Sequence, residues 1–221
     1  MVVMHLYAAL LPPPDALERV RAVAAGVAPV PERPVVSGPP GRHRLGRRRE
    51  PEAPPPPVAP MLDLLPTAAM HLPVAKFGNL AVNDAHRLAD AMERDARTWE
   101  SPRLSLAGGL ALEPEGDVSV WAKLTGDLDA LASLNQGVAR AAKGLHLFVD
   151  RRVFRPHVQL GTVNDHTTAS YLEEVLAVLE EFESEKWWQT TLSLLTPADL
   201  GPGHPPHKSF RTIPLGPAVA H

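Results

Sequence analysis

The sequence contains one pattern twice: a histidine that opens an apolar run, then a glycine, an Asn-Asp pair and a helical stretch. His71 opens the run His-Leu-Pro-Val in the first copy, and His157 opens His-Val-Gln-Leu in the second. The distance from histidine to asparagine is twelve residues in the first copy and seven in the second, so chance similarity remains an alternative. Both copies predict the order strand, turn, cap and helix, which favours a duplicated unit whose two lobes face one another.

Apolar patterns along the whole chain predict an α+β fold. Short apolar runs indicate strands, and apolar residues three and four apart indicate amphipathic helices. These elements do not alternate as regularly as those of a doubly wound parallel sheet. We expect two pseudo-symmetric lobes, each an antiparallel-rich sheet with outer helices, around a central cleft that His71 and His157 face. The expected strands span 2–11, 70–77, 105–112, 118–124, 157–163, 187–195 and 211–215, and the expected helices span 15–24, 85–98, 128–143 and 170–182.

Polar residues beside these helices predict where the helices begin and end. Asp15, the pair Asn83-Asp84, and either Asp165 or Thr167 are placed as N-caps, because their side-chain oxygens can accept the free N–H groups of a first turn. Gly144 follows the third helix and predicts a left-handed C-cap.

Composition excludes several classes of site. The chain has no cysteine, which excludes disulfides, thiolate nucleophiles, zinc-thiolate sites and iron–sulfur clusters and favours a reducing cytoplasm. The apolar segment 1–11 is short and has no basic flank, so it predicts a buried strand rather than a signal peptide. No stretch approaches the ~18 apolar residues of a membrane span. The net charge of −3 gives no general attraction to a polyanion, so a nucleic acid would need a local basic patch.

Residues 31–60 form a segment of unusual composition. Ten of its thirty positions are proline and six are arginine, most of the latter between Arg42 and Arg49. Such a segment cannot bury enough apolar surface to offset its ordering entropy. We interpret it as a solvated insertion in a single bilobal domain that spans 1–221; the alternative is a basic arm that contacts RNA phosphates.

Two histidines on facing strands suit one kind of chemistry. An imidazole with a pKa near 6.5 is available as base or acid at neutral pH, so one histidine can take a proton while the other gives one. In-line attack on a phosphodiester needs these two transfers, on opposite sides of phosphorus, and requires neither a metal nor a covalent intermediate.

The sequence resembles the 2H phosphoesterases, specifically the bacterial 2′-5′ RNA ligase-like, RNA 2′,3′-cyclic phosphodiesterase branch. The resemblance extends over most of the chain and is most specific in Phe154-Arg155-Pro156-His157. It implies two lobes that each contribute a His-x-Thr/Ser-x motif to a central cleft. It assigns catalysis to His71 and His157.

The sequence departs from the family pattern two residues after each histidine. Pro73 and Gln159 stand where the family has a Thr or Ser whose hydroxyl binds phosphate oxygens. Pro73 has no donor, and its missing N–H predicts an edge strand or a bulge. Gln159 keeps an amide that can contact phosphate, and Arg155 is either a second phosphate ligand or a salt-bridge partner between the lobes.

The other readings of these side chains are structural. Each histidine could simply end a buried strand with its ring bonded to a backbone carbonyl. Lys76 lies an odd number of residues from His71, so it is expected on the opposite face unless a bulge changes the register. His204 and His207 have a spacing that a metal site could use, but the proline-rich loop around them lacks a carboxylate cluster, and we predict neither a metal nor a cofactor.

Two functions therefore remain open. The first is a metal-independent RNA 2′,3′-cyclic phosphodiesterase or 2′-5′ RNA ligase-like enzyme that acts on RNA 2′,3′-cyclic phosphate ends or small cyclic nucleotides. The second is an impaired relative that binds a nucleotide or RNA end without efficient turnover, because positions 73 and 159 have changed; a third alternative is a relic without a ligand. We expect a cytoplasmic monomer with no membrane contact.

Overall fold

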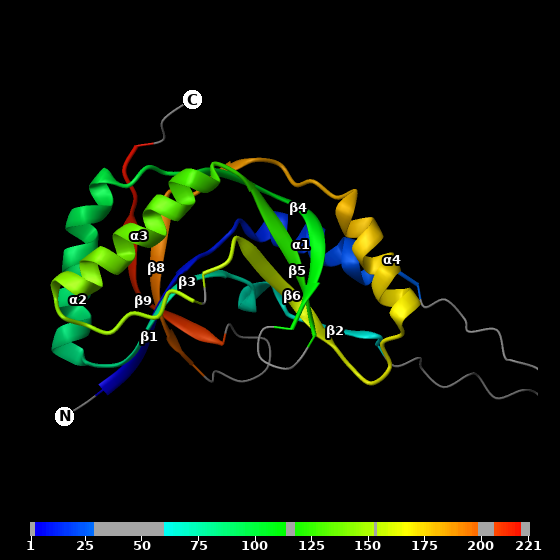
Figure 1. Cartoon of the computed structure of the whole chain (residues 1–221), viewed down its shortest axis with the longest axis horizontal. Helices are drawn as coiled ribbons and strands as arrows, with labels where there is room; N and C mark the ends of the chain where they lie inside the picture. Colours follow the sequence, from blue (N-terminus) through cyan, green and yellow to red (C-terminus); the bar gives the residue numbers. More distant parts are fainter. Residues whose placement is uncertain (1–2, 29–59, 114–117, 153, 199–205, 218–221) are drawn as a thin grey trace, which may run out of the picture.

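The computed structural model describes residues 3–28, 60–113, 118–152, 154–198 and 206–217. These residues form two antiparallel sheets with helices outside them, as Figure 1 shows. The four-stranded sheet has the order β3-β1-β8-β9, made of Leu72–Ala81, Val3–Leu10, Thr191–Pro197 and His207–Pro214. The five-stranded sheet has the order β2-β6-β5-β4-β7, made of Leu62–Leu64, His157–Val163, Ser119–Gly126, Arg103–Leu112 and Trp187–Trp188. The expected α+β fold with two antiparallel lobes is confirmed.

Each sheet is covered by two helices. One follows a strand of that sheet in the sequence, and the other follows a strand of the other sheet. The helices are α1 (Pro14–Ala25), α2 (Val82–Asp95), α3 (Leu128–Gly144) and α4 (Ala169–Glu180), with short 3₁₀ turns at Thr67–Ala69 and Ala96–Thr98. α1 follows β1 of the four-stranded sheet but packs against α4, beside the five-stranded sheet. α3 follows β5 of the five-stranded sheet but packs against α2 and β3. This exchange joins the two lobes through their helices.

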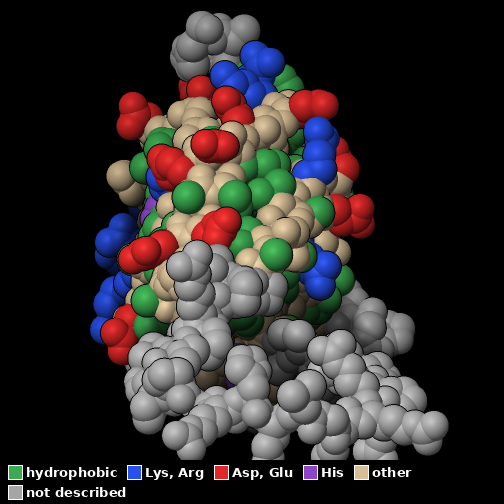
Figure 2. Space-filling model, turned by 90° about the vertical axis from the view of Figure 1, so that its right-hand side faces the viewer, with side chains coloured by type: hydrophobic (Ala, Val, Ile, Leu, Met, Phe, Trp, Pro, Cys, Tyr) green, Lys and Arg blue, Asp and Glu red, His purple; other side chains and the backbone are tan. Residues whose placement is uncertain are grey.

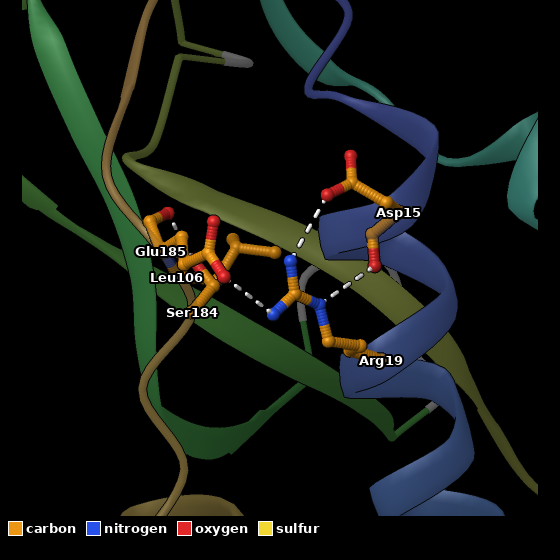
Figure 3. A network of polar contacts seen from close by, with 5 residues as sticks. All are labelled: Asp15, Arg19, Leu106, Ser184 and Glu185. Atoms are coloured by element: carbon orange, nitrogen blue, oxygen red, sulfur yellow. Dashed lines mark hydrogen bonds and ion pairs between the residues drawn. The ribbon is translucent and has the colours of Figure 1, made fainter.

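Polar contacts link α1 to the segment between α4 and β7 (Figure 3). Arg19 on α1 bonds Asp15 one turn earlier, at 3.0 Å, and Glu185 in the segment between α4 and β7, at 3.3 Å. Next to Glu185, the Ser184 hydroxyl accepts the backbone N–H of Leu106 on β4 at 2.9 Å. The exposed ion pairs contribute little to stability. Burial of the apolar face of α1 dominates, with Leu17 and Val20 at its centre.

The outer surface over α1 and α4 carries charges of both signs. Figure 2 views this side of the molecule, where acidic and basic side chains are interspersed among hydrophobic ones. Such a face lacks the single sign that a polyanion-binding surface needs.

Six of the seven expected strands each correspond to one strand, but the strand expected at 187–195 is divided into β7 and β8, which lie in different sheets, and β2 was not expected. Several helix boundaries were also wrong. α1 has Pro13 as its N-cap, and Asp15 lies in its first turn. α2 begins at Val82, which places Asn83 and Asp84 inside the helix. α4 is capped by Thr168, one residue beyond the expected Thr167, and the Thr168 hydroxyl accepts the N–H of Tyr171.

The C-terminal end of α3 also differs from the expectation. Gly144 is its last helical residue, and the left-handed backbone occurs at His146, with φ of 58°. Most of the proline-rich segment lies outside the described residues. Within the described residues, no helix is both long and apolar enough to cross a membrane.

Candidate active site

His71 lies immediately before β3, in contact with the four-stranded sheet. Its Nδ1 lies 2.9 Å from the carbonyl oxygen of Ala69. Its ring is 5.6 Å from the ring of Tyr7 on β1 and 5.5 Å, edge to face, from the ring of His207 on β9. His71 is therefore held by three strands of one sheet and by the 3₁₀ turn that precedes it.

His157 is the first residue of β6, in the five-stranded sheet. Its Nδ1 lies 2.6 Å from the carbonyl oxygen of Pro156, and its backbone N–H donates to the carbonyl of Arg155 at 2.7 Å. Lys123 is its cross-strand partner on β5, but the Lys123 ammonium bonds Glu180 of α4 at 2.9 Å. The carbonyl of the residue just before the strand thus fixes the direction of the ring.

The two histidines share one hydrogen-bonding arrangement. A carbonyl oxygen only accepts, so Nδ1 of each ring must carry the proton that is donated to it. In the neutral ring this leaves a lone pair on Nε2, the nitrogen then available as a base. The structural alternative was a histidine at the end of a strand with its ring bonded to a carbonyl. The same hydrogen bond would also orient a catalytic base, so this geometry fits both interpretations.

Burial lowers the pKa of both histidines below the ordinary value near 6.5. For His71, desolvation is the main cause, opposed by the Ala69 carbonyl and reinforced by the charges of His207 and Lys76. For His157, desolvation is again the main cause, opposed by the Pro156 carbonyl, and the charges of Arg155 and Lys123 lower the pKa further. Both rings are accordingly mainly neutral at pH 7 in the free protein.

β3 and β6, the strands that follow these histidines, contact each other where the two sheets meet. The segment between α3 and β6 also joins this region, because Asp150 and Lys76 exchange backbone hydrogen bonds of 2.8 and 2.9 Å. The structure thus brings together β3, which follows His71, and β6, which begins at His157, although they belong to different sheets. The joint action of both imidazoles on one ligand stays a prediction.

Pro73 and Gln159, which stand where the family has a Thr or Ser, differ in their hydrogen-bond donors. Pro73 lies on β3, which is the edge strand of its sheet, next to a register shift in the pairing with β1. The edge strand and the irregularity expected from its missing N–H are both found. Gln159 lies on the same face of β6 as His157 and donates from Nε2 to the Ser119 hydroxyl at 3.1 Å. Its second amide N–H has no partner among the described residues.

Arg155 is exposed, and its guanidinium forms no ion pair with any described residue. A salt bridge between the lobes, one of the two alternatives for Arg155, is therefore not found in the described part of the chain. Its charge acts on His157, whose pKa it helps to lower. A role in phosphate binding remains a prediction.

His207 is the site residue whose position the sequence did not reveal. It begins β9, is 9% exposed, and its Nδ1 is buried without a hydrogen-bond partner in the described residues. Its contact with His71 joins residues 136 positions apart, which no local spacing predicts. His204, whose spacing from His207 a metal site could use, lies outside the described residues.

No family model and no curated protein matches the sequence. Among solved structures, TT0787 of Thermus thermophilus matches 96% of this chain and 98% of its own, with a TM-score of 0.62 and 16% identity. E. coli LigT in complex with 3′-AMP matches 97% of this chain and 99% of its own, with a TM-score of 0.60 and 16% identity.

A structure described as a phosphoesterase matches 97% of this chain and 99% of its own, with a TM-score of 0.60 and 15% identity. These likenesses define a class by fold: a bilobal α+β architecture that this chain shares with LigT and a phosphoesterase over nearly its whole length. The fold implied by the resemblance to the 2H phosphoesterases is thereby confirmed.

Proposed function

We propose that the chain is a metal-independent 2′,3′-cyclic phosphodiesterase of the 2H type, with His71 and His157 as its acid–base pair. The observation that carries this proposal is that both imidazoles make the same kind of hydrogen bond through Nδ1. Each ring donates Nδ1–H to a backbone carbonyl within two residues of it. β3 and β6 contact each other where the two sheets meet. Such an arrangement leaves two Nε2 atoms for proton transfer.

The reaction that fits this pair is hydrolysis of a 2′,3′-cyclic phosphate. The neutral Nε2 of one histidine removes a proton from water as the water oxygen forms a bond to phosphorus. The bond from phosphorus to O3′ breaks, and O3′ takes the proton from the other histidine, which is protonated at the start. The product carries a 2′-phosphate, and the two histidines have exchanged their protonation states.

The negative charge of the substrate supports the required protonation. Burial lowers both pKa values in the free protein, so neither ring is mainly charged at pH 7. A phosphodiester anion beside the rings favours the charged form of one of them. Solved structures of LigT contain 3′-AMP, ATP and NADP+, which supports nucleotides as the ligand class.

A second candidate is nucleotide or RNA-end binding without efficient turnover. It is favoured by one observation: neither position 73 nor position 159 carries the family hydroxyl, and Gln159 already uses one N–H on Ser119. Loss of one transition-state hydrogen bond typically costs about 10² to 10³ in rate.

Turnover of adenosine 2′,3′-cyclic monophosphate in the presence of EDTA distinguishes the two candidates. We expect adenosine 2′-monophosphate as product, retention of activity with the chelator, and loss of activity in His157→Ala. His166→Ala, which removes an exposed imidazole from the turn after β6, is the matched control and should keep wild-type activity. Binding of the 2′-monophosphate without turnover would favour the second candidate, and activity unaffected by His157→Ala would refute the mechanism.

A further inference from the structure

We propose that Lys76 holds a phosphate oxygen beside His71, where position 73 offers no donor, and that a β-bulge at Val74 brings it there. The inference rests on the proposed phosphodiesterase function and names a residue of that same site. The sequence placed Lys76 on the opposite face unless a bulge intervened, and the register of β3 against β1 decides between the two cases.

The pairing of β3 with β1 contains a shift that changes the face of Lys76. Pro73 lies opposite Ala9, and Ala75 lies opposite Ala8, so Val74 is an extra residue on β3. Lys76, the next residue along β3, lies opposite Tyr7. Tyr7 and Ala9 are two apart on β1 and share a face. Lys76 and Pro73, their partners, therefore share that face too, the one on which Tyr7 contacts His71.

Helix α3, which follows a strand of the five-stranded sheet but packs against β3, stabilises this bulge. The carbonyl of Val74, the extra residue, accepts a 2.9 Å hydrogen bond from the buried Asn135 amide of α3. On the opposite edge of β3, the backbone N–H and carbonyl of Lys76 are bonded to Asp150. The Lys76 backbone is thus fixed on both sides, which is typical of a bulge that directs a side chain to a site.

The ammonium of Lys76 is available for a ligand. Lys76 is exposed and forms no ion pair with any described residue, whereas Lys123, opposite His157, is bonded to Glu180. Its charge acts on His71, because it helps to lower the pKa of that imidazole. A lysine ammonium binds phosphate as a point charge with three donors, so it can supply the contact that a threonine hydroxyl would otherwise provide.

Equilibrium binding of adenosine 2′-monophosphate, measured by calorimetry with EDTA present, tests this assignment without turnover. We expect Lys76→Met to weaken binding at least tenfold and Lys76→Arg to stay within about threefold of wild type, because the charge is kept. Lys143→Met, which removes an exposed lysine from the end of α3, is the matched control and should bind as wild type does. Thermal melting of all variants should be unchanged, which separates ligand contact from a structural effect.

Titration of the His71 ring by NMR provides a second measurement, which depends only on how near the Lys76 charge lies to His71. Removal of the nearby positive charge in Lys76→Met should raise the pKa of His71, and Lys143→Met should not. If the wild-type protein binds the 2′-monophosphate and hydrolyses the cyclic phosphate, and Lys76→Met binds with the same affinity as wild type, this inference is overturned. The proposed function would then remain intact. A wild-type protein that neither binds the 2′-monophosphate nor hydrolyses the cyclic phosphate would overturn both.

Discussion

Single residues set the protonation chemistry of the candidate site. The carbonyl that orients each imidazole belongs to a near neighbour in sequence, Ala69 for His71 and Pro156 for His157. The tautomer is therefore a local property of the chain, and burial then lowers the pKa of both rings. A pair of this kind is active when one ring is protonated and the other is neutral.

The pH profile of kcat/KM follows from these directions. Its two limbs report the free enzyme's histidines, and both pKa values lie below 6.5, so the maximum should lie on the acidic side of 6.5. Above it the general acid loses its proton, and the rate should fall about tenfold for each further pH unit. Steady-state rates between pH 4.5 and 8.5 measure this, and a plateau or a rise from pH 6 to 8 would be the contrary result.

Restoring the family hydroxyls should raise the rate. If Thr at 73 or 159 regains a hydrogen bond made in the transition state, kcat should increase by up to about 10² for each position. Pro73→Thr also restores a backbone N–H, so Pro73→Ala is the control that restores the N–H without a hydroxyl. Gln159→Ala plays the same part for Gln159→Thr. Equal rates in the Thr and Ala variants would show that the hydroxyls contribute nothing.

At the scale of elements, the irregularities of β3 matter as much as its regular pairing. The bulge at Val74 leaves a carbonyl that Asn135 of α3 satisfies from 61 residues away. Removal of the amide leaves a buried acceptor without a partner, which typically costs about 1–3 kcal/mol.

Asn135→Ala should therefore lower the free energy of unfolding by that amount, about 1–3 kcal/mol, in urea titrations. Gln136→Ala is the matched control, since Gln136 is the exposed neighbour on the same helix. An equal and small loss in both variants would mean that the bulge does not depend on the Asn135 amide.

The sequence predicted the strands well because their signal is local. Apolar runs gave β1 and β6 nearly to the residue, and the missing N–H of Pro73 gave the edge strand and its irregularity. The bulge itself could not be positioned, because it depends on a contact between β3 and α3. Counting residues from His71 places Lys76 on the opposite face unless a bulge intervenes, and the bulge at Val74 is the exception that the prediction allowed for.

The two copies of the sequence repeat are also less alike in local structure than in sequence. Gly78 of the first copy has φ of 69°, a left-handed backbone at a register shift. Gly161 of the second copy lies against β2, where an added Cβ would meet the Asp63 carbonyl oxygen at 2.5 Å. Asn83 lies inside α2, whereas Asn164 forms the turn after β6 and donates to Asp63 at 3.0 Å. The shared pattern predicted two similar units but not these separate local roles.

On the scale of the whole molecule, the lobes are joined by helices that cross from one to the other. α1 and α3 each follow a strand of one sheet and pack beside the other sheet. The relative position of β3 and β6 is therefore fixed by the cores of both lobes. The contact of His71 with His207 could not be predicted from sequence for the same reason, since it requires the last strand to close its sheet.

In the proposed mechanism, His71 and His157 act together on one phosphodiester, one from each lobe. The most direct test is kcat for adenosine 2′,3′-cyclic monophosphate in His71→Ala, His157→Ala and the double variant, with melting temperatures measured alongside. Each single change should lower kcat by about 10² to 10⁴, as loss of general acid or base does. Because the two rings act as a unit, the double variant should be no slower than the slower single variant. Wild-type kcat in either single variant, or losses that multiply in the double variant, would contradict the claim.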